Sequence, residues 1–175
     1  MEKRFAVGLI VNNVPGVMNR IAGLYSKRNY NIVALSGGET EDPRYTRITI
    51  VSSGDEYMMD QVLRQLEKLY DVKSIMVLDS DTAVFAQHMF IKMHLTGTYR
   101  GSTKHQALEL INEYGGKIID FGEEHVTAEL TGTKEEMDSF IEKVSKFGIM
   151  EVSRSGDIAI GLGSENTISA FDNDL

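Results

Sequence analysis

The segment NNVPGVMNR, residues 12–20, contains the side chains best suited to holding a small charged ligand. A loop that leads into a helix presents N–H groups without intrahelical partners and a partial positive charge, which together attract a carboxylate. Gly16 would let a ligand approach the backbone closely, because it has no side chain in the way. Asn13 can both donate and accept hydrogen bonds, as a zwitterion with an ammonium and a carboxylate group requires. The alternative is that Asn13 is a turn or capping residue, and this segment alone favours neither interpretation.

The same segment also admits an enzymatic interpretation. VPGVMNR resembles the phosphate-cradle loop of acylphosphatases, ferredoxin-like enzymes in which backbone N–H groups and an arginine hold an acyl phosphate. Arg20 would be that arginine. Such enzymes also orient a water molecule with an asparagine on the third strand, and residues 44–52 contain none. The sequence therefore favours binding over catalysis.

Other residues that could do chemistry form no recognisable constellation. The chain has no cysteine, which excludes disulfides, thiolate metal sites and cysteine nucleophiles. Gly161 and Gly163 lack the third glycine and the strand–turn–helix context of a dinucleotide site. The histidines have no metal-ligand spacing, and the paired acids lie in expected turns: His88, His94, His105, His125, Asp79, Asp81, Glu123 and Glu124. We therefore expect no catalytic residue, no metal and no cofactor in this chain.

Composition indicates a cytoplasmic protein with one domain of ordinary size or two small ones. Hydrophobic residues make up 42% of the 175, and no apolar run approaches the ~20 residues of a membrane helix. The N-terminal MEKRFAVGLIV leads into polar turn residues without a small-residue cleavage site, so we expect no secretory signal. A net charge of −8 argues against nucleic acid or an anionic membrane as the partner, since phosphate binding depends on Lys and Arg.

The elements that position the segment follow from hydrophobic periodicity. Pro15 is expected in the first turn of a helix, where its missing N–H would be unpaired anyway. The pattern predicts a strand over 4–12, a helix from Pro15, strands over 31–37 and 44–52, a helix after Gly54-Asp55 and a strand over 72–78. The predicted order is βαββαβ.

The same order repeats in the second half of the chain. After an expected polar linker over 80–88, alternation from Met89 predicts a strand, a helix ends near Gly115, and KIIDF and HVTAELT predict two strands. Thr133 and Glu136 have the spacing of a capping box, and IMEVSR is the last clear strand. The predicted domains are 1–79 and 89–161, followed by a polar tail over 162–175 with the composition of a disordered segment.

Two such units predict an α+β protein with two tandem ferredoxin-like βαββαβ domains. NNVPGVMNRIAGLYSKRNYNI, with RYTRITI and QLEKLYDV after it, resembles the ACT domain, a small-molecule sensor usually tuned to amino acids. RNYNIVAL, GGKIIDF, LTGTKEEMDSFI and EVSRSG extend the resemblance to the small regulatory subunits of acetolactate synthase. The resemblance covers residues 3–161, and only the tail departs from it.

The resemblance implies a non-catalytic subunit in branched-chain amino-acid biosynthesis. Such a subunit associates with a catalytic subunit that holds thiamine diphosphate, Mg and FAD, raises its activity, and imposes feedback inhibition by valine. The choice among valine, leucine and isoleucine stays open, as does the surface that contacts the catalytic subunit. For the second domain we favour dimerisation and signal relay, because GTYRGSTKH lacks the chemistry of the first loop. The alternative function is a stand-alone tandem ACT sensor in transcriptional regulation, which no basic helix supports.

The resemblance also implies a homodimer whose ACT domains pair side by side and bind valine at their interface. Asn13 and Gly16 would come from the loop of one protomer, and Asn31 from the other. Neighbouring residues would supply backbone donors and an apolar wall. The implied effector-binding residues are Asn13, Val14, Pro15, Gly16, Val17, Met18, Asn31 and Ile32.

Overall fold

The computed structural model describes residues 3–95, 103–164 and 167. Contacts divide the chain into two compact units. The first comprises Met1–Phe85 together with Asp157–Leu175, and the second comprises Ala86–Gly156. Each unit is described by itself below.

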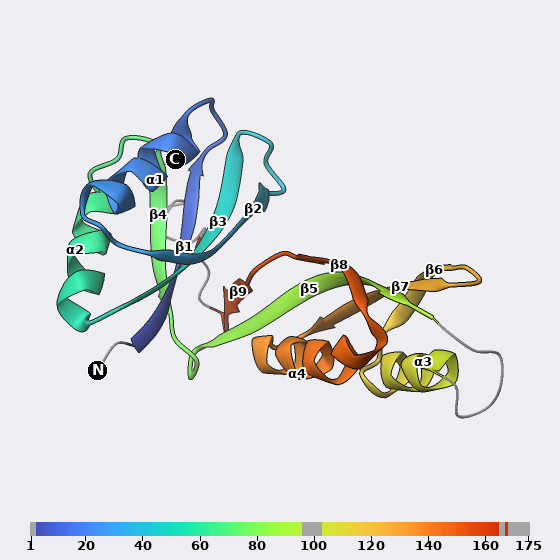
Figure 1. The fold of residues 1–175 in the computed structure, drawn as a ribbon. Coiled ribbons are helices and arrows are strands. Elements are labelled where there is room, and N and C mark those ends of the chain that lie inside the picture. Colours follow the sequence, from blue (N-terminus) through green and yellow to red (C-terminus); the bar gives the residue numbers. More distant parts are fainter. Residues whose placement is uncertain (1–2, 96–102, 165–166, 168–175) are drawn as a thin grey trace. The chain divides into compact units, whose positions relative to one another are not determined.

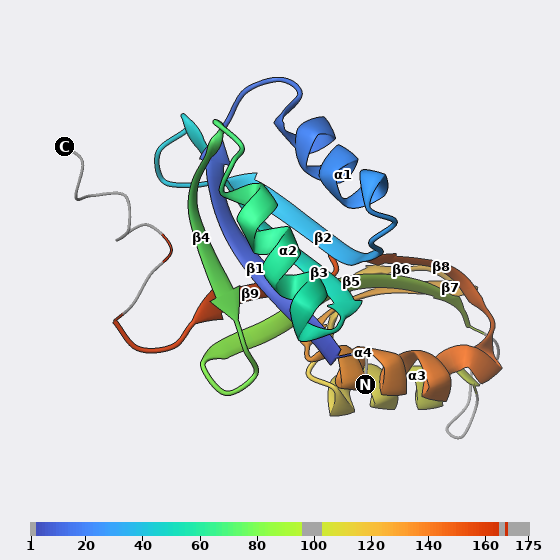
Figure 2. The ribbon, with the colours of Figure 1, turned by 90° about the vertical axis from the view of Figure 1, so that its left-hand side faces the viewer.

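The first unit has a four-stranded antiparallel sheet with two helices on one face (Figures 1 and 2). Its elements are β1 (Lys3–Asn12), α1 (Val17–Lys27), β2 (Ile32–Glu39), β3 (Tyr45–Gly54), α2 (Glu56–Leu66) and β4 (Val72–Leu78). The strands lie in the order β2-β3-β1-β4, with β1 in the middle pairing with β3 and β4. This arrangement confirms the predicted βαββαβ order.

Apolar side chains between the sheet and the two helices form the core of the first unit. Val7, Leu9 and Val11 of β1 are fully buried and occupy alternate positions, as expected for one face of a strand. Ile21 of α1 and Leu66 of α2 pack in the same cluster. This packing fixes the position of α1 over the sheet, and hence the position of the loop that precedes it.

The second unit repeats the architecture. Its elements are β5 (Ala83–His94), α3 (Thr103–Glu113), β6 (Lys117–Phe121), β7 (His125–Gly132), α4 (Lys134–Val144), a 3₁₀ turn (Ser145–Phe147) and β8 (Ile149–Arg154). The strand order is β6-β7-β5-β8. Thr133 and Glu136 form the predicted capping box at the start of α4. The α+β fold with two tandem ferredoxin-like units is therefore confirmed.

The face of the first sheet opposite its helices is covered by residues that follow the second unit. The Asp157 carboxylate forms an ion pair with Arg4 of β1, and its backbone carbonyl accepts a hydrogen bond from Ser36 of β2 at 2.8 Å. The Arg47 guanidinium of β3 donates to the carbonyl of Ala159 at 2.6 Å. Ala159 belongs to a short strand, β9 (Ile158–Gly161), that pairs with β5, a strand whose first residues, up to Phe85, belong to the first unit. These contacts explain why the sequence beyond Gly156 groups with the first unit.

Two segments differ from the sequence expectations. β5 already begins at Ala83, so most of the expected linker over 80–88 is strand. Ala83 and Gln87 in this stretch are buried, so its residues have the burial pattern of a strand. Their hydrophobicity does not follow that pattern, and the strand could not be predicted from it. In the expected tail over 162–175, Thr167 is buried and its hydroxyl accepts a hydrogen bond from Arg47 at 3.0 Å. Most of that tail lies outside the described residues.

Candidate functional site

The loop between β1 and α1 ends in a glycine that leaves the helix start open. Gly16 is the N-cap of α1 and has a φ of 86°, in the left-handed region that favours glycine. No side chain caps this end, so the N–H groups of Met18 and Asn19 have no acceptor within the helix. The expected helix start at Pro15 is wrong, because the left-handed turn delays the helix to Val17. The predicted positive end of a helix dipole is nevertheless present beside this loop.

The Asn13 side chain connects this loop to the end of β2. Its amide nitrogen donates to the Glu39 carboxylate at 3.1 Å and to the Pro43 carbonyl at 3.0 Å. Its backbone N–H donates to the carbonyl of Arg44 at 2.7 Å. Asn13 therefore does not cap α1, and the ligand-binding role that was the other alternative from sequence stays a prediction. Asn13 holds the loop against the β2–β3 connection.

Charges beside the loop are paired rather than free. Arg20, in the first turn of α1, forms an ion pair with Asp71, which directly precedes β4. Asn12 donates to the same carboxylate at 3.3 Å. An arginine held in this way is poorly placed to grip an acyl phosphate, and β3 carries no asparagine. The acylphosphatase interpretation therefore loses both of its requirements.

The remaining loop residues differ in what they offer a ligand. Val14 is 42% exposed and Pro15 is also exposed, so both present apolar surface at the loop. Val17 is buried in the core, and Met18 packs partly against it. Val17 and Met18 can therefore contribute backbone groups, whereas the apolar wall of the site must come from Val14 and Pro15.

Asn31 and Ile32 lie at the opposite end of the sheet. Ile32 pairs with Ser52, which in turn pairs with Phe5 near the start of β1, whereas the loop follows Asn12 at the end of β1. The seven steps between residues from Phe5 to Asn12 span about 23 Å of extended strand. The structure therefore brings together Asn13, Val14, Pro15, Gly16, Val17 and Met18, and separates Asn31 and Ile32 from them.

Two acidic residues lie beside the loop although the sequence did not predict them there. Glu39 contacts Asn13, and Asp71 contacts both Asn12 and Arg20. Nothing local distinguishes them, because Glu39 lies in a Gly-Gly-Glu-Thr run and Asp71 follows an ordinary helix end. Only the register of β2 with β3, and of β1 with β4, brings them to the loop.

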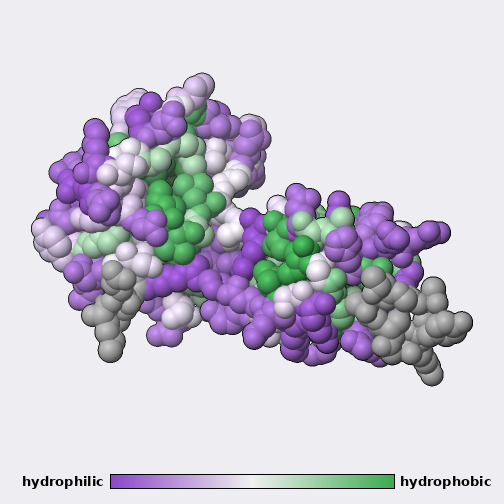
Figure 3. All heavy atoms as spheres, in the orientation of Figure 1, coloured by the Kyte–Doolittle hydropathy of each residue, from purple (hydrophilic) through white to green (hydrophobic). Residues whose placement is uncertain are grey.

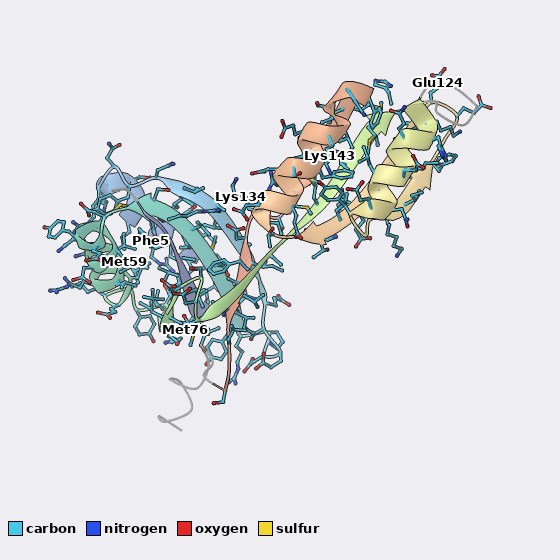
Figure 4. The ribbon with its side chains drawn as sticks, turned by 90° about the horizontal axis from the view of Figure 1, so that it is seen from below. Phe5, Met59, Met76, Glu124, Lys134 and Lys143 are labelled. Atoms are coloured by element: carbon cyan, nitrogen blue, oxygen red, sulfur yellow. The ribbon has the colours of Figure 1, made fainter. Side chains whose placement is uncertain are left out.

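A second hollow in the first unit suits a carboxylate ligand less well. Phe5 of β1 and Met59 of α2, both labelled in Figure 4, line an open cavity of about 530 Å³. Its charged lining consists of Arg4, which is paired with Asp157, and of the acidic residues Asp55, Glu56 and Asp79. These acidic groups would repel an anion, so the β1–α1 loop is the better candidate for an amino-acid effector.

Neither a metal cluster nor a membrane-spanning helix occurs among the residues that the structure describes. Over residues 3–95, 103–164 and 167, no group of three or more His, Cys, Asp or Glu side chains could hold a metal ion. In the same part of the chain, no helix is long and apolar enough to cross a membrane.

Two ferredoxin-like units, the first with an open helix start after its first strand, define an ACT-domain protein. In agreement, residues 7–74 match the family model described as AHAS small subunit-like ACT domain. Residues 87–163 match the model described as small subunit of acetolactate synthase. The chain belongs to the family of acetolactate synthase small subunits.

Relatives from distant organisms support this assignment. The chain is 34% identical to a probable acetolactate synthase small subunit of Methanothermobacter thermautotrophicus, over 90% of this chain and 92% of the relative. It is 32% identical to the small subunit of acetolactate synthase isozyme 3 of Escherichia coli, over 93% and 98%. Among solved structures, the acetolactate synthase small subunit of Thermotoga maritima superposes with a TM-score of 0.85 at 27% identity, over 93% of this chain and 99% of that one.

Proposed function

We propose that this chain is the regulatory subunit of acetolactate synthase, which activates the catalytic subunit and makes it sensitive to feedback inhibition by valine. Family membership supports the first part, and the open helix start beside Gly16 and Asn13 supports the second. In this proposal the chain works in the cytoplasm and has no catalytic residue of its own. Thiamine diphosphate, Mg and FAD belong to the catalytic subunit.

Valine would bind at the β1–α1 loop through its two charged groups. Its carboxylate would lie against the uncapped N–H groups at the start of α1, where the helix dipole favours negative charge. Its ammonium would be held by acceptors beside them, the Asn13 amide oxygen and the Glu39 carboxylate. The exposed side chains of Val14 and Pro15 would contact the isopropyl group, with ~0.8 kcal/mol for each buried methylene.

A second copy of the chain would complete the site. β2 is an outer strand in the order β2-β3-β1-β4, and Glu39 at its end is tied to Asn13. In an antiparallel two-fold pairing along β2, the start of this strand in one copy lies beside its end in the other. Asn31 and Ile32 of one copy would then approach the loop of its partner. Within a single copy the ~23 Å separation prevents a molecule as small as valine from touching both places.

Reconstitution with the catalytic subunit tests this function. Acetolactate formation would be measured with the catalytic subunit alone and with increasing amounts of this chain, and then as a function of valine concentration. We expect activation that saturates and inhibition by valine that requires this chain. Absence of activation would contradict the regulatory assignment, and activation without valine sensitivity would contradict the effector assignment. Turnover of pyruvate by this chain alone would contradict its non-catalytic role.

A further inference from the structure

A basic groove runs between the two helices of the first unit. α1 and α2 lie side by side on the same face of the sheet (Figure 2). The groove between them has an open volume of about 680 Å³. Its charged lining consists of Arg20, Lys27, Arg28 and Lys68. We call it the α1–α2 groove.

The positive charge of this groove contrasts with the rest of the molecule. The whole chain has a net charge of −8, yet α1 contains no acidic residue. Arg20 is paired with Asp71. Lys27, Arg28 and Lys68 are exposed, and within the described part of the chain they form no ion pair. Three uncompensated cations therefore line one groove of an acidic protein.

The spacing of the cations suits an elongated ligand. Arg20 and Lys27 are seven residues apart on α1, which is about 10 Å along a helix axis. A single phosphate needs cations that converge on one point, whereas a row of this length matches about three residues of extended chain. Lys68 flanks the groove from beyond the end of α2. The geometry thus favours a polypeptide segment over a small anion.

The groove also has the apolar floor of a protein interface. Leu24 of α1 and Leu69, after α2, line it, and both pack partly against the core beneath. Gly23 has no Cβ, and a side chain there would meet no atom within 4 Å, so the groove is open at this position. An apolar centre with a charged rim is typical of surfaces that bind another protein.

We infer that the α1–α2 groove binds an acidic segment of the acetolactate synthase catalytic subunit. This inference rests on the proposed function and adds to it the surface and the chemistry of the contact. α1 then carries the effector loop at its start and the docking groove along its side. Because one helix serves both, a ligand that alters the start of α1 acts directly on an element that contacts the catalytic subunit.

Charge reversal in the groove provides the test. Binding of the catalytic subunit to the immobilised chain would be measured by biolayer interferometry for wild type, K27E/K68E and the milder K27Q/K68Q. The matched control is K117E/K146E, which makes the same charge change at exposed lysines of the second unit. Circular dichroism and thermal unfolding would establish that each variant is folded. Measurements would run from about 50 to about 300 mM salt, because the Debye screening length becomes shorter as the salt concentration rises.

We expect K27E/K68E to raise the Kd by about tenfold or more and to flatten its salt dependence, with a smaller increase for K27Q/K68Q. The control should stay close to wild type. An unchanged Kd in both groove variants, or an equal loss in the control, would overturn the inference. So would loss of the dimer in K27E/K68E by sedimentation, which would assign the groove to a second copy. Displacement of the catalytic subunit by inorganic phosphate at constant ionic strength would assign it to a small anion.

The wild-type arm separates this inference from the proposed function. If wild-type chain does not bind the catalytic subunit, the regulatory assignment fails together with the inference. If wild type binds and activates while the groove variants behave identically to it, the regulatory assignment stands and only the groove is excluded.

Discussion

Substituting Gly16 by aspartate tests the effector site most directly. Gly16 has a φ of 86°, and the left-handed region costs a residue with a side chain about 1–2 kcal/mol. A carboxylate at a helix N-terminus stabilises the folded state by about 0.3–1 kcal/mol. The net expectation is a loss of about 1 kcal/mol, or a fall in Tm of about 2–4 °C for a chain of this size. From the charge alone the substitution would be neutral or stabilising, and the backbone conformation reverses that sign.

The effect on valine should be larger than the effect on folding. The new carboxylate would occupy the field of the helix start, where the carboxylate of valine is proposed to lie. A Cβ at this position lies 3.3 Å from the Arg20 guanidinium, whose opposite charge would offset part of the repulsion between the two carboxylates. Two carboxylates about 4 Å apart, that of the introduced aspartate and that of valine, would repel by about 1 kcal/mol in bulk water and about 4 kcal/mol near a protein surface. We therefore expect the valine concentration for half-inhibition to rise by about tenfold or more. Activation of the catalytic subunit should persist, since residue 16 does not line the α1–α2 groove.

Two glycine controls separate charge from strain. G16A imposes a similar backbone strain at the loop without a charge. G163D places the same charge and a comparable strain at a φ of 80°, where a Cβ meets no atom within 4 Å. Each variant would be reconstituted with the catalytic subunit and titrated with valine. Wild-type sensitivity of G16D would show that the carboxylate of valine binds elsewhere. Equal loss in G16A would show that strain alone is responsible, and equal loss in G163D would show that the effect is not specific to the loop.

Three further variants test other parts of the reasoning. Asn31 is exposed, so Asn31→Ala should weaken valine inhibition with little change in Tm. A mixed dimer of one Asn31→Ala chain and one G16D chain should retain one intact site if the two positions act across the interface. Inhibition unaffected by Asn31→Ala would exclude that residue. Hydrogen bonds from Lys134 and Arg154 lower the pKa of the Asp138 carboxyl, so its stabilisation is complete above the ordinary value of 3.8 and is lost as the pH falls through the lower folded value. Urea unfolding of D138N should show a flatter acid limb, and an unchanged pH profile would contradict this. Thr133→Ala should lower the unfolding free energy by about 1 kcal/mol through loss of the capping box, whereas an unchanged urea midpoint would contradict that role.

The second unit exposes several large hydrophobic side chains. Figure 3 shows apolar surface on this unit, and Phe90, Ile118 and Phe121 are each more than 40% exposed. Phe90 lies on the face of the sheet away from the core, whereas Ile118 and Phe121 pair with the buried Ala128 and Val126 and lie on the helix side, so the three do not form one patch. The dimerisation role that the sequence favours for the second domain stays a prediction.

Periodicity by itself determined the order of the strands and helices and the fold class, but not the starts of α1 and β5. The alternation of Val7, Leu9 and Val11 depends on the two-residue repeat of a strand, and the capping box of Thr133 with Glu136 depends on contacts three residues apart. Such relations are local, so they can be recognised without knowing where the rest of the chain lies. The β1–α1 loop could be proposed as a binding element for the same reason.

Tertiary structure decided everything that depends on residues distant in sequence. The Asn13–Glu39 hydrogen bond joins residues 26 positions apart, and Ser36 bonds to the carbonyl of Asp157 across 121 positions. The separation of Asn31 from the loop follows from strand register, because β2 runs parallel to β1 with β3 between them. The left-handed turn at Gly16 likewise could not be predicted from its residue type, since glycine adopts either sign of φ about equally readily. Sequence patterns report which face of an element is buried, whereas pairing and register arise only when the whole sheet assembles.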